Sequence, residues 1–179
     1  MQNHIVAFSG YRYFSGKVQS LAAASKILAA LPTGVTVATG CCPSGLDLHI
    51  RLACAQSGQP IKVFKAVNQN PQSLRARTLS LVAASAAVFV FPRNSCPISS
   101  GSWLAVWAAV RSGLPVFVYL PSVHVSALPC LAGVIRWCLV SAPFASAVAL
   151  YSPIVNQTSL FNQVQPITFE FGHLSRSPK

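Results

Sequence analysis

Residues 35–64, VTVATGCCPSGLDLHIRLACAQSGQPIKVF, decide the fold class, because they place a strand, a glycine-rich turn, a helix and a second strand in succession. VTVAT (35–39) and IKVF (61–64) are short runs of apolar and β-branched residues, which are typical of buried strands. Between them a helix is predicted from Gly45 to Gln56, with Gly58 as its stop signal. Such a unit predicts two parallel strands joined by a crossover helix.

The same alternation continues on both sides of this unit. The remaining predicted strands are HIVAF (4–8), AAVFVF (86–91) and PVFVY (115–119), and the remaining predicted helices cover 17–31, 73–85 and 102–111. Apolar strands alternating with helices predict a doubly wound α/β domain, with a parallel sheet covered on both faces, over residues 1–120. Residues 121–179 form a C-terminal extension that we expect to pack on the same domain. Within it, 131–140 fits either helix or strand, and ITFEF (167–171) fits a late strand.

The charge of the chain is one-sided. The 179 residues hold 13 Lys and Arg against 2 Asp and Glu, a formal net charge of +11, while 53% of the residues are hydrophobic. That hydrophobic fraction excludes a disordered basic polymer. Ten of the 13 bases, but only one of the acids, lie in residues 1–120. Most bases there lack an internal acidic partner, so a nucleic acid or a nucleotide phosphate is the expected complement.

Three polar loops follow strands of the predicted sheet. Because the carboxyl ends of parallel strands share one edge, we expect these loops to meet there, where ligands of such folds bind. Glycines and helix N-termini suit phosphate, and arginines add charge-assisted contacts. Each loop taken alone is also an ordinary turn. The predicted nucleotide or nucleic-acid site consists of Ser9, Gly10, Tyr11, Arg12, Gly40, Ser44, Gly45, Asp47, Arg93, Ser100, Gly101 and Ser102.

Asp47 is the only acid before Glu170. Ser44-Gly45-Leu46-Asp47 matches a capping box, in which Ser44 caps the helix and Asp47 reaches back to its N–H. The alternative is that Asp47 binds a ribose or base, or fixes the neighbouring loop. With Glu170 far away in the sequence, a general acid/base pair is hard to build.

Other candidate chemistry is weaker. Cys41, Cys42, His49 and Cys54 do not have the spacing of a metal site, so no metal is expected. No nucleophile-elbow motif accompanies His49 or His124, and no cofactor is expected. We expect Trp103 and Trp107 to pack in the core rather than stack on bases, whereas Tyr11, Tyr13 and Phe14 are better stacking candidates.

The sequence also bears on compartment. The chain begins without a basic region and apolar run, so no secretory signal is expected, and the six cysteines are predicted to be reduced thiols in the cytoplasm. Residues 127–150 are long enough to span a bilayer, but Arg136, Pro129 and Pro143 interrupt them. A membrane span is therefore not favoured, and self-association stays open.

Three segments together resemble the Rossmann-like domain of the SLOG superfamily, which includes the DNA-processing protein A (Smf) family and the LOG phosphoribohydrolases. They are VAFSGYR (6–12), ATGCCPSGLDLHIRLACAQSG (38–58) and residues 81–119. Gly10-Tyr11-Arg12 is similar to the family's Gly-Ser-Arg, GCCPSGLD to its Gly-x-Asp turn, and Ser100-Gly101-Ser102 to its Ser-Gly-Ser. The resemblance implies nucleotide or single-stranded DNA binding at these loops.

The departures from the family pattern decide between its branches. LOG enzymes carry a Glu shortly after this last motif, whereas Trp103-Leu104-Ala105-Val106 follows here. We therefore expect a non-catalytic protein that binds single-stranded nucleic acid or a nucleotide. The alternatives are a nucleotide N-glycosidase of the LOG type and a membrane-associated or oligomeric nucleotide sensor.

Overall fold

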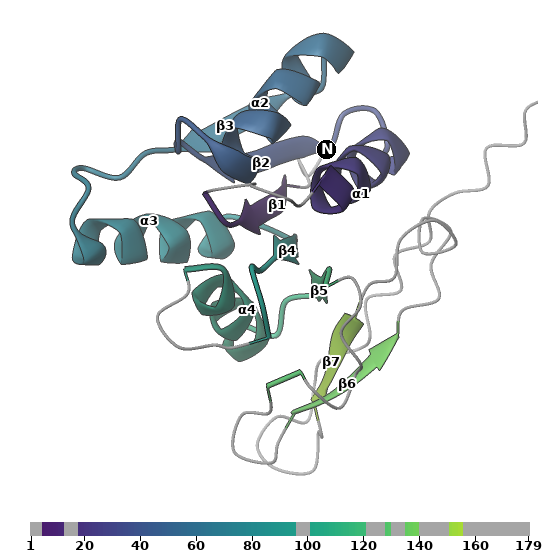
Figure 1. Ribbon diagram of the computed structural model, residues 1–179, viewed down its shortest axis with the longest axis vertical. Helices are drawn as coiled ribbons and strands as arrows, with labels where there is room; N and C mark the ends of the chain where they lie inside the picture. Colours follow the sequence, from purple (N-terminus) through teal and green to yellow (C-terminus); the bar gives the residue numbers. More distant parts are fainter. Residues whose placement is uncertain are drawn as a thin grey trace, which may run out of the picture.

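The computed structural model describes most of the first 120 residues and three short segments beyond them (Figure 1). The described ranges are 5–12, 18–95, 101–120, 128–129, 135–139 and 151–155. The strand predicted at 167–171 lies outside them, as do Tyr13, Phe14 and Ser100.

Strands and helices alternate through the described part of the first 120 residues. They are β1 (Ile5–Gly10), α1 (Val18–Ala30), β2 (Thr36–Gly40), α2 (Gly45–Ser57), β3 (Ile61–Phe64), α3 (Pro71–Ala83), β4 (Ala87–Phe91), α4 (Gly101–Arg111) and β5 (Val116–Val118). Every element predicted there is confirmed, with ends within about two residues, the usual uncertainty of helix and strand boundaries. Two more strands follow, β6 (Ile135–Leu139) and β7 (Tyr151–Val155), so the ambiguous stretch at 131–140 contains a strand.

All seven strands belong to one sheet, in the order β3-β2-β1-β4-β5-β7-β6. The pairings among β1 to β5 are parallel, whereas β7 runs antiparallel to β5 and β6 antiparallel to β7. The predicted doubly wound parallel α/β sheet is therefore confirmed, and two antiparallel strands extend it. The division at residue 120 stays a prediction.

The strand order reverses beside β1. From β1 the chain moves outward through β2 to β3, and then returns to the other side of β1 for β4, where Gly10 pairs with Phe91. The loops that follow β1 and β4 therefore run in opposite directions, the first toward β2 and the second toward β5. They leave a crevice at the carboxyl edge of the sheet, the usual ligand position in this architecture.

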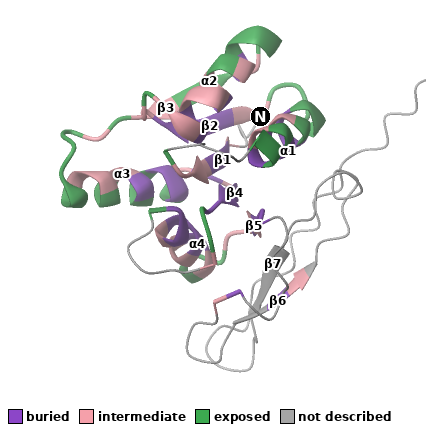
Figure 2. Ribbon diagram, in the orientation of Figure 1, coloured by how far each residue is buried: buried purple, intermediate pink, exposed green. Residues whose placement is uncertain are grey.

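One face of the sheet is aromatic and is covered by α1 and α2 (Figures 1 and 2). Phe8, Phe89 and Phe91 are at most 2% exposed and project to this face, because alternate residues of a strand share a side. The ring centroids of Phe8 and Phe89 lie 5.4 Å apart. Ile27 of α1 and Leu46 of α2 belong to the same cluster and cover the aromatic rings on the helix side.

The opposite face holds smaller strand residues and is covered by α3 and α4. Ala7, Val88 and Val90 pack there against helical side chains that include Leu81 of α3 and Trp103 of α4. Both faces of the central strands are thus buried, which explains their continuous apolar sequences. No helix in the described part of the chain has the length and apolarity needed to cross a membrane.

Replacing Phe8 by Ala is expected to lower the free energy of unfolding by about 3–5 kcal/mol, because it removes a fully buried ring that stacks on two others. Urea unfolding followed by circular dichroism measures this. Val67→Ala is the control, since Val67 is 97% exposed and its loss should change stability by less than about 0.5 kcal/mol. Equal effects of the two changes would contradict this description of the core.

The contact between α1 and α2 predicts a dependence of stability on pH. Ser25 Oγ lies 2.8 Å from His49 Nε2. Burial lowers the pKa of His49 below its ordinary value of 6.5, and a hydrogen bond to the backbone of Leu21 only partly opposes this shift. The unfolded chain therefore takes up the proton more readily than the folded one. The stabilisation is complete above the ordinary pKa and is lost as the pH falls through the folded-state pKa.

Melting temperatures measured between about pH 8 and pH 5 should fall less steeply for His49→Gln than for the native chain. Glutamine keeps a polar partner for Ser25 but has no proton to gain. Identical pH profiles for the two proteins would contradict the assigned role of His49.

Candidate functional site

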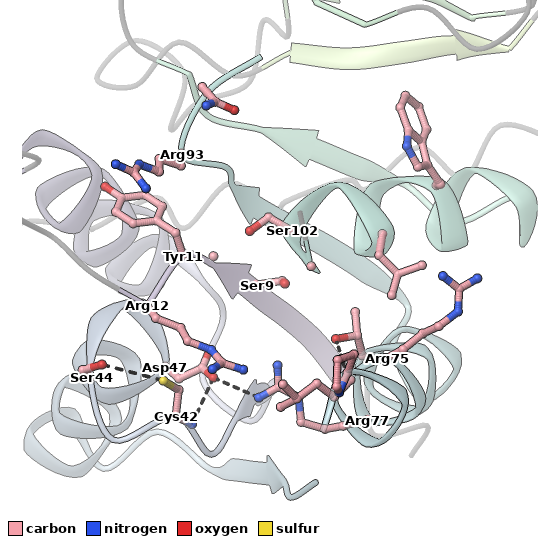
Figure 3. A pocket seen from close by; sticks show the side chains of 18 residues that line it. Ser9, Tyr11, Arg12, Cys42, Ser44, Asp47, Arg75, Arg77, Arg93 and Ser102 are labelled. Carbon is pink, nitrogen blue, oxygen red and sulfur yellow. Dashed lines mark hydrogen bonds and ion pairs between the residues drawn. The ribbon is translucent and has the colours of Figure 1, made fainter. Parts of the chain in front are cut away.

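A pocket of about 820 Å³ lies at the carboxyl edge of the sheet, around the reversal of strand order (Figure 3). Its lining comes from the end of β1 and the loop after it, the loop after β2 and the first turn of α2, the loop after β4, and the helices α3 and α4. This volume lies in the range of small-molecule and cofactor sites. Segments far apart in the sequence thus converge on one cavity.

Nine of the twelve predicted site residues line this pocket: Ser9, Gly10, Tyr11, Arg12, Ser44, Asp47, Arg93, Gly101 and Ser102. Gly40 and Gly45 do not line it, and Ser100 lies outside the described residues. The sequence analysis missed a whole wall, which α3 supplies through Pro71, Leu74, Arg75, Arg77 and Thr78. It also missed Leu104 and Trp107, whereas Cys42 and Asn94 lie within the predicted loops but were not singled out as site residues.

The start of α3 has a local cause that the sequence already contained. Asn70 is its N-cap and accepts a hydrogen bond from the backbone N–H of Ser73 at 2.7 Å, and Pro71 occupies the first turn. The helix therefore begins at the carboxyl edge of the sheet, directly after the β3 loop. Arg75 and Arg77 in its second turn were the residues of the sequence that could have indicated this wall of the pocket.

Asp47 holds the second loop together, but it does not do so as a capping box. Ser44 is the N-cap of α2 and its side chain makes no capping hydrogen bond. The carboxylate of Asp47 instead accepts hydrogen bonds from Thr39 Oγ1 and the Cys42 backbone N–H, each at 3.2 Å, and pairs with Arg77 Nη1 at 3.4 Å. The predicted capping box is therefore wrong, and the alternative of a loop-fixing carboxylate fits.

Arg51 supports the same loop from the next turn of α2. Its Nη2 donates to the Cys42 carbonyl at 2.7 Å, and its Nε donates to the Asp47 carbonyl at 3.3 Å. Both backbone polar groups of Cys42 are thus bound, one by Asp47 and one by Arg51. The glycine-rich loop is fixed before any ligand arrives, which reduces the entropic cost of binding.

The N-terminus of α2 is closed by the first loop. Gly45 has φ +72°, and a side chain at this position would collide with the carbonyl oxygens of Tyr11 and Arg12. The backbone N–H of Leu46 donates to the Tyr11 carbonyl at 3.3 Å. Gly45 therefore permits the close contact of two loops rather than a phosphate, because a glycine has no Cβ to block it.

The N-terminus of α4 has a different setting. Gly101 is exposed and lines the pocket, and a Cβ added there would meet nothing within 4 Å. Ser102 beside it is 4% exposed. The preceding loop is tied to the helix, because Trp103 Nε1 donates to the Asn94 carbonyl at 2.9 Å. The N-terminus of α2 thus contacts the first loop, whereas Gly101 and Ser102 at the N-terminus of α4 line the cavity.

The charge of the pocket is strongly positive. Four arginines line it, Arg12, Arg75, Arg77 and Arg93, against the single carboxylate of Asp47 among the described lining residues. Arg77 is 16% exposed and is paired with Asp47, whereas the other three are exposed (Figure 3). A concave site with a surplus of guanidinium groups attracts anions and suits phosphate.

The other groups that the sequence singled out divide between the core and the pocket wall. Cys54 is 1% exposed, and burial raises the pKa of its thiol, in keeping with a core residue. Tyr11 is half-buried on the pocket wall, and burial also raises the pKa of its phenol. Trp103 is fully buried as predicted, but Trp107 is half-buried and lines the pocket. Within the described ranges, no three His, Cys, Asp or Glu residues are placed to hold a metal ion.

Comparison with known proteins supports the fold. No protein-family model matches the chain, and no curated protein sequence matches it significantly. Among solved structures, the X-ray structure of DNA processing protein A (DprA) from Streptococcus pneumoniae is similar, with a TM-score of 0.54 and 15% sequence identity. The similarity covers 69% of this chain and 53% of that chain. The chain thus shares a DprA-like fold over about half the length of that protein, and the wider SLOG assignment stays a prediction.

Replacing Asp47 by Ala is expected to lower the free energy of unfolding by about 1–3 kcal/mol, because the buried hydroxyl of Thr39 and the partly buried donors of Cys42 and Arg77 lose their acceptor. Ser44→Ala is the matched control and should change stability by less than about 0.5 kcal/mol, since no capping bond is lost. Urea unfolding compares the two. A loss of about 1 kcal/mol in Ser44→Ala, the usual cost of removing a cap, would restore the capping box.

Proposed function

We propose that this protein binds single-stranded nucleic acid, or a nucleotide, through phosphates held in the arginine-lined pocket at the carboxyl edge of its sheet. The observation that carries this proposal is the pocket itself: about 820 Å³ at the reversal of strand order, with four arginines and one engaged carboxylate. Gly101 and Ser102 in the first turn of α4 line the same cavity, and the N-terminus of a helix suits an anion.

The surplus charge of the whole chain supports a polyanionic partner. The net charge is +11, and nine of those eleven charges belong to residues 1–120, which form the α/β sheet and its helices. A polyanion gains from many such contacts at once, since each neutralised phosphate releases condensed counterions. The likeness to DNA processing protein A, whose name refers to DNA, supports the same class of ligand.

We favour binding over glycosidic bond hydrolysis. Asp47 is the one carboxylate among the described lining residues, and its oxygens already accept hydrogen bonds from Thr39, Cys42 and Arg77. A carboxylate that is bound in this way is poorly available to activate water. Release of free base from nucleoside monophosphates, followed by chromatography, would establish the hydrolase instead.

Binding of a labelled single-stranded oligonucleotide, measured by fluorescence anisotropy, is expected to weaken steeply between about 50 mM and 200 mM salt. Arg12→Ala and Arg93→Ala should each reduce the affinity about 10-fold and make the salt dependence shallower, because each removes a charge-assisted contact from the pocket.

Arg111→Ala is the matched control. Arg111 is an exposed arginine at the end of α4 that does not line the pocket, so its removal should change affinity much less. Absent or salt-independent binding would refute the proposal. So would equal losses in all three variants, since that would indicate a diffuse attraction to net charge.

A further inference from the structure

The pocket has a second wall whose chemistry differs from that of the arginines. Leu74 of α3, together with Leu104 and Trp107 of α4, lines the part of the pocket between these two helices. A site that held only phosphate would gain nothing from apolar side chains. An apolar wall beside a cationic one suits a ligand with an anionic part and a planar apolar part.

Trp107 is the largest group on this wall, and it rests on a fixed support. Its ring stacks on that of Trp103, with centroids 5.6 Å apart and planes at 27°. Trp103 is itself fully buried and lies edge-on to Trp137 at 6.0 Å, and its indole N–H is bound to the Asn94 carbonyl. The outer indole is therefore held in one orientation, which lowers the entropic cost of a contact with a ligand.

The distance of Trp107 from the N-terminus of α4, where we propose that phosphate binds, suits a nucleotide. It lies five residues after Ser102 on the same helix, a rise of about 7.5 Å along the axis. That separation is close to the span of a sugar phosphate. A helical side chain also leans toward the helix N-terminus, so the indole lies over the turn before it, and Trp107, Gly101 and Ser102 all line the same pocket.

We infer that Trp107 is the base-stacking residue of this pocket: it receives the face of a nucleobase whose phosphate is held at the arginine-lined end. The inference rests on the proposed function and adds the base contact to it. Because every base has an aromatic face, stacking on Trp107 favours nucleotides over other phosphates without selecting a particular base. Trp107 packs against the core, as the sequence predicted, but it is only half-buried and also lines the pocket.

The test compares a short single-stranded oligothymidylate with the same strand carrying tetrahydrofuran abasic sites throughout. The two probes have equal phosphate charge, so their difference in affinity reports the bases alone. The native chain should bind the base-bearing strand about 5- to 150-fold more tightly, the range that stacking on one aromatic side chain supplies. Trp107→Leu should remove most of that preference, and Trp107→Phe should keep part of it.

The outcomes separate this inference from the proposed function. Equal affinity of the native chain for both strands, or a preference that persists in Trp107→Leu, would overturn the stacking role while leaving phosphate binding intact. Failure of both strands to bind would overturn the proposed function and this inference with it. If Trp107→Leu does not fold by circular dichroism, the abasic comparison on the native chain and the Trp107→Phe variant decides.

Discussion

One buried carboxylate connects the parts of this protein that form the pocket. Asp47 sits in the first turn of α2 and receives hydrogen bonds from β2 through Thr39, from the glycine-rich loop through Cys42 and from α3 through Arg77. It lies against Gly40, where a side chain would collide with the Asp47 and Arg77 groups. In a chain with two acids, this arrangement places one of them where it neutralises a partly buried arginine and orders the loop.

The position of the Asp47 carboxylate explains how the positive charges of the pocket are arranged. Arg77 is engaged in holding the site together, while Arg12, Arg75 and Arg93 remain exposed around it. Four arginines against one carboxylate leave the described lining with a surplus of positive charge, and a second acid nearby would have reduced that surplus and weakened the attraction of the pocket for anions. The scarcity of acids thus leaves the described lining of the cavity positively charged, which is the basis of the proposal that it binds an anionic ligand.

The sequence predicted the alternating strands and helices well, because each element carries its own periodicity and stop signals. Gly58 and Gly113 illustrate this: both adopt positive φ just after helices. It also predicted that the loops after β1, β2 and β4 meet at one site, since loops after parallel strands must share one edge. The sequence could not predict which hydrogen-bond partners a polar side chain has in the folded protein. Ser44 and Asp47 fit the capping-box spacing, but the competing donors of Thr39 and Arg77 come from other elements.

Long-range packing also explains the missing wall. That α3 reaches the pocket depends on the neighbouring positions of β3 and β2 and on the contact between α3 and α4, which no local pattern encodes. Trp103 and Trp107 occupy equivalent positions one turn apart, and either could have been the buried one. Only the assembled sheet, with Trp137 beside Trp103, makes one a core residue and the other part of the cavity.

Backbone amide shifts recorded by nuclear magnetic resonance during titration with a short single-stranded oligonucleotide test the central claim most directly. The structure predicts that the largest changes cluster at the carboxyl edge, at Gly10, Tyr11, Asn94, Gly101 and Ser102, with small changes at the opposite edge around Thr36 and Ala87. Changes centred away from these loops, or none at saturating oligonucleotide, would contradict it.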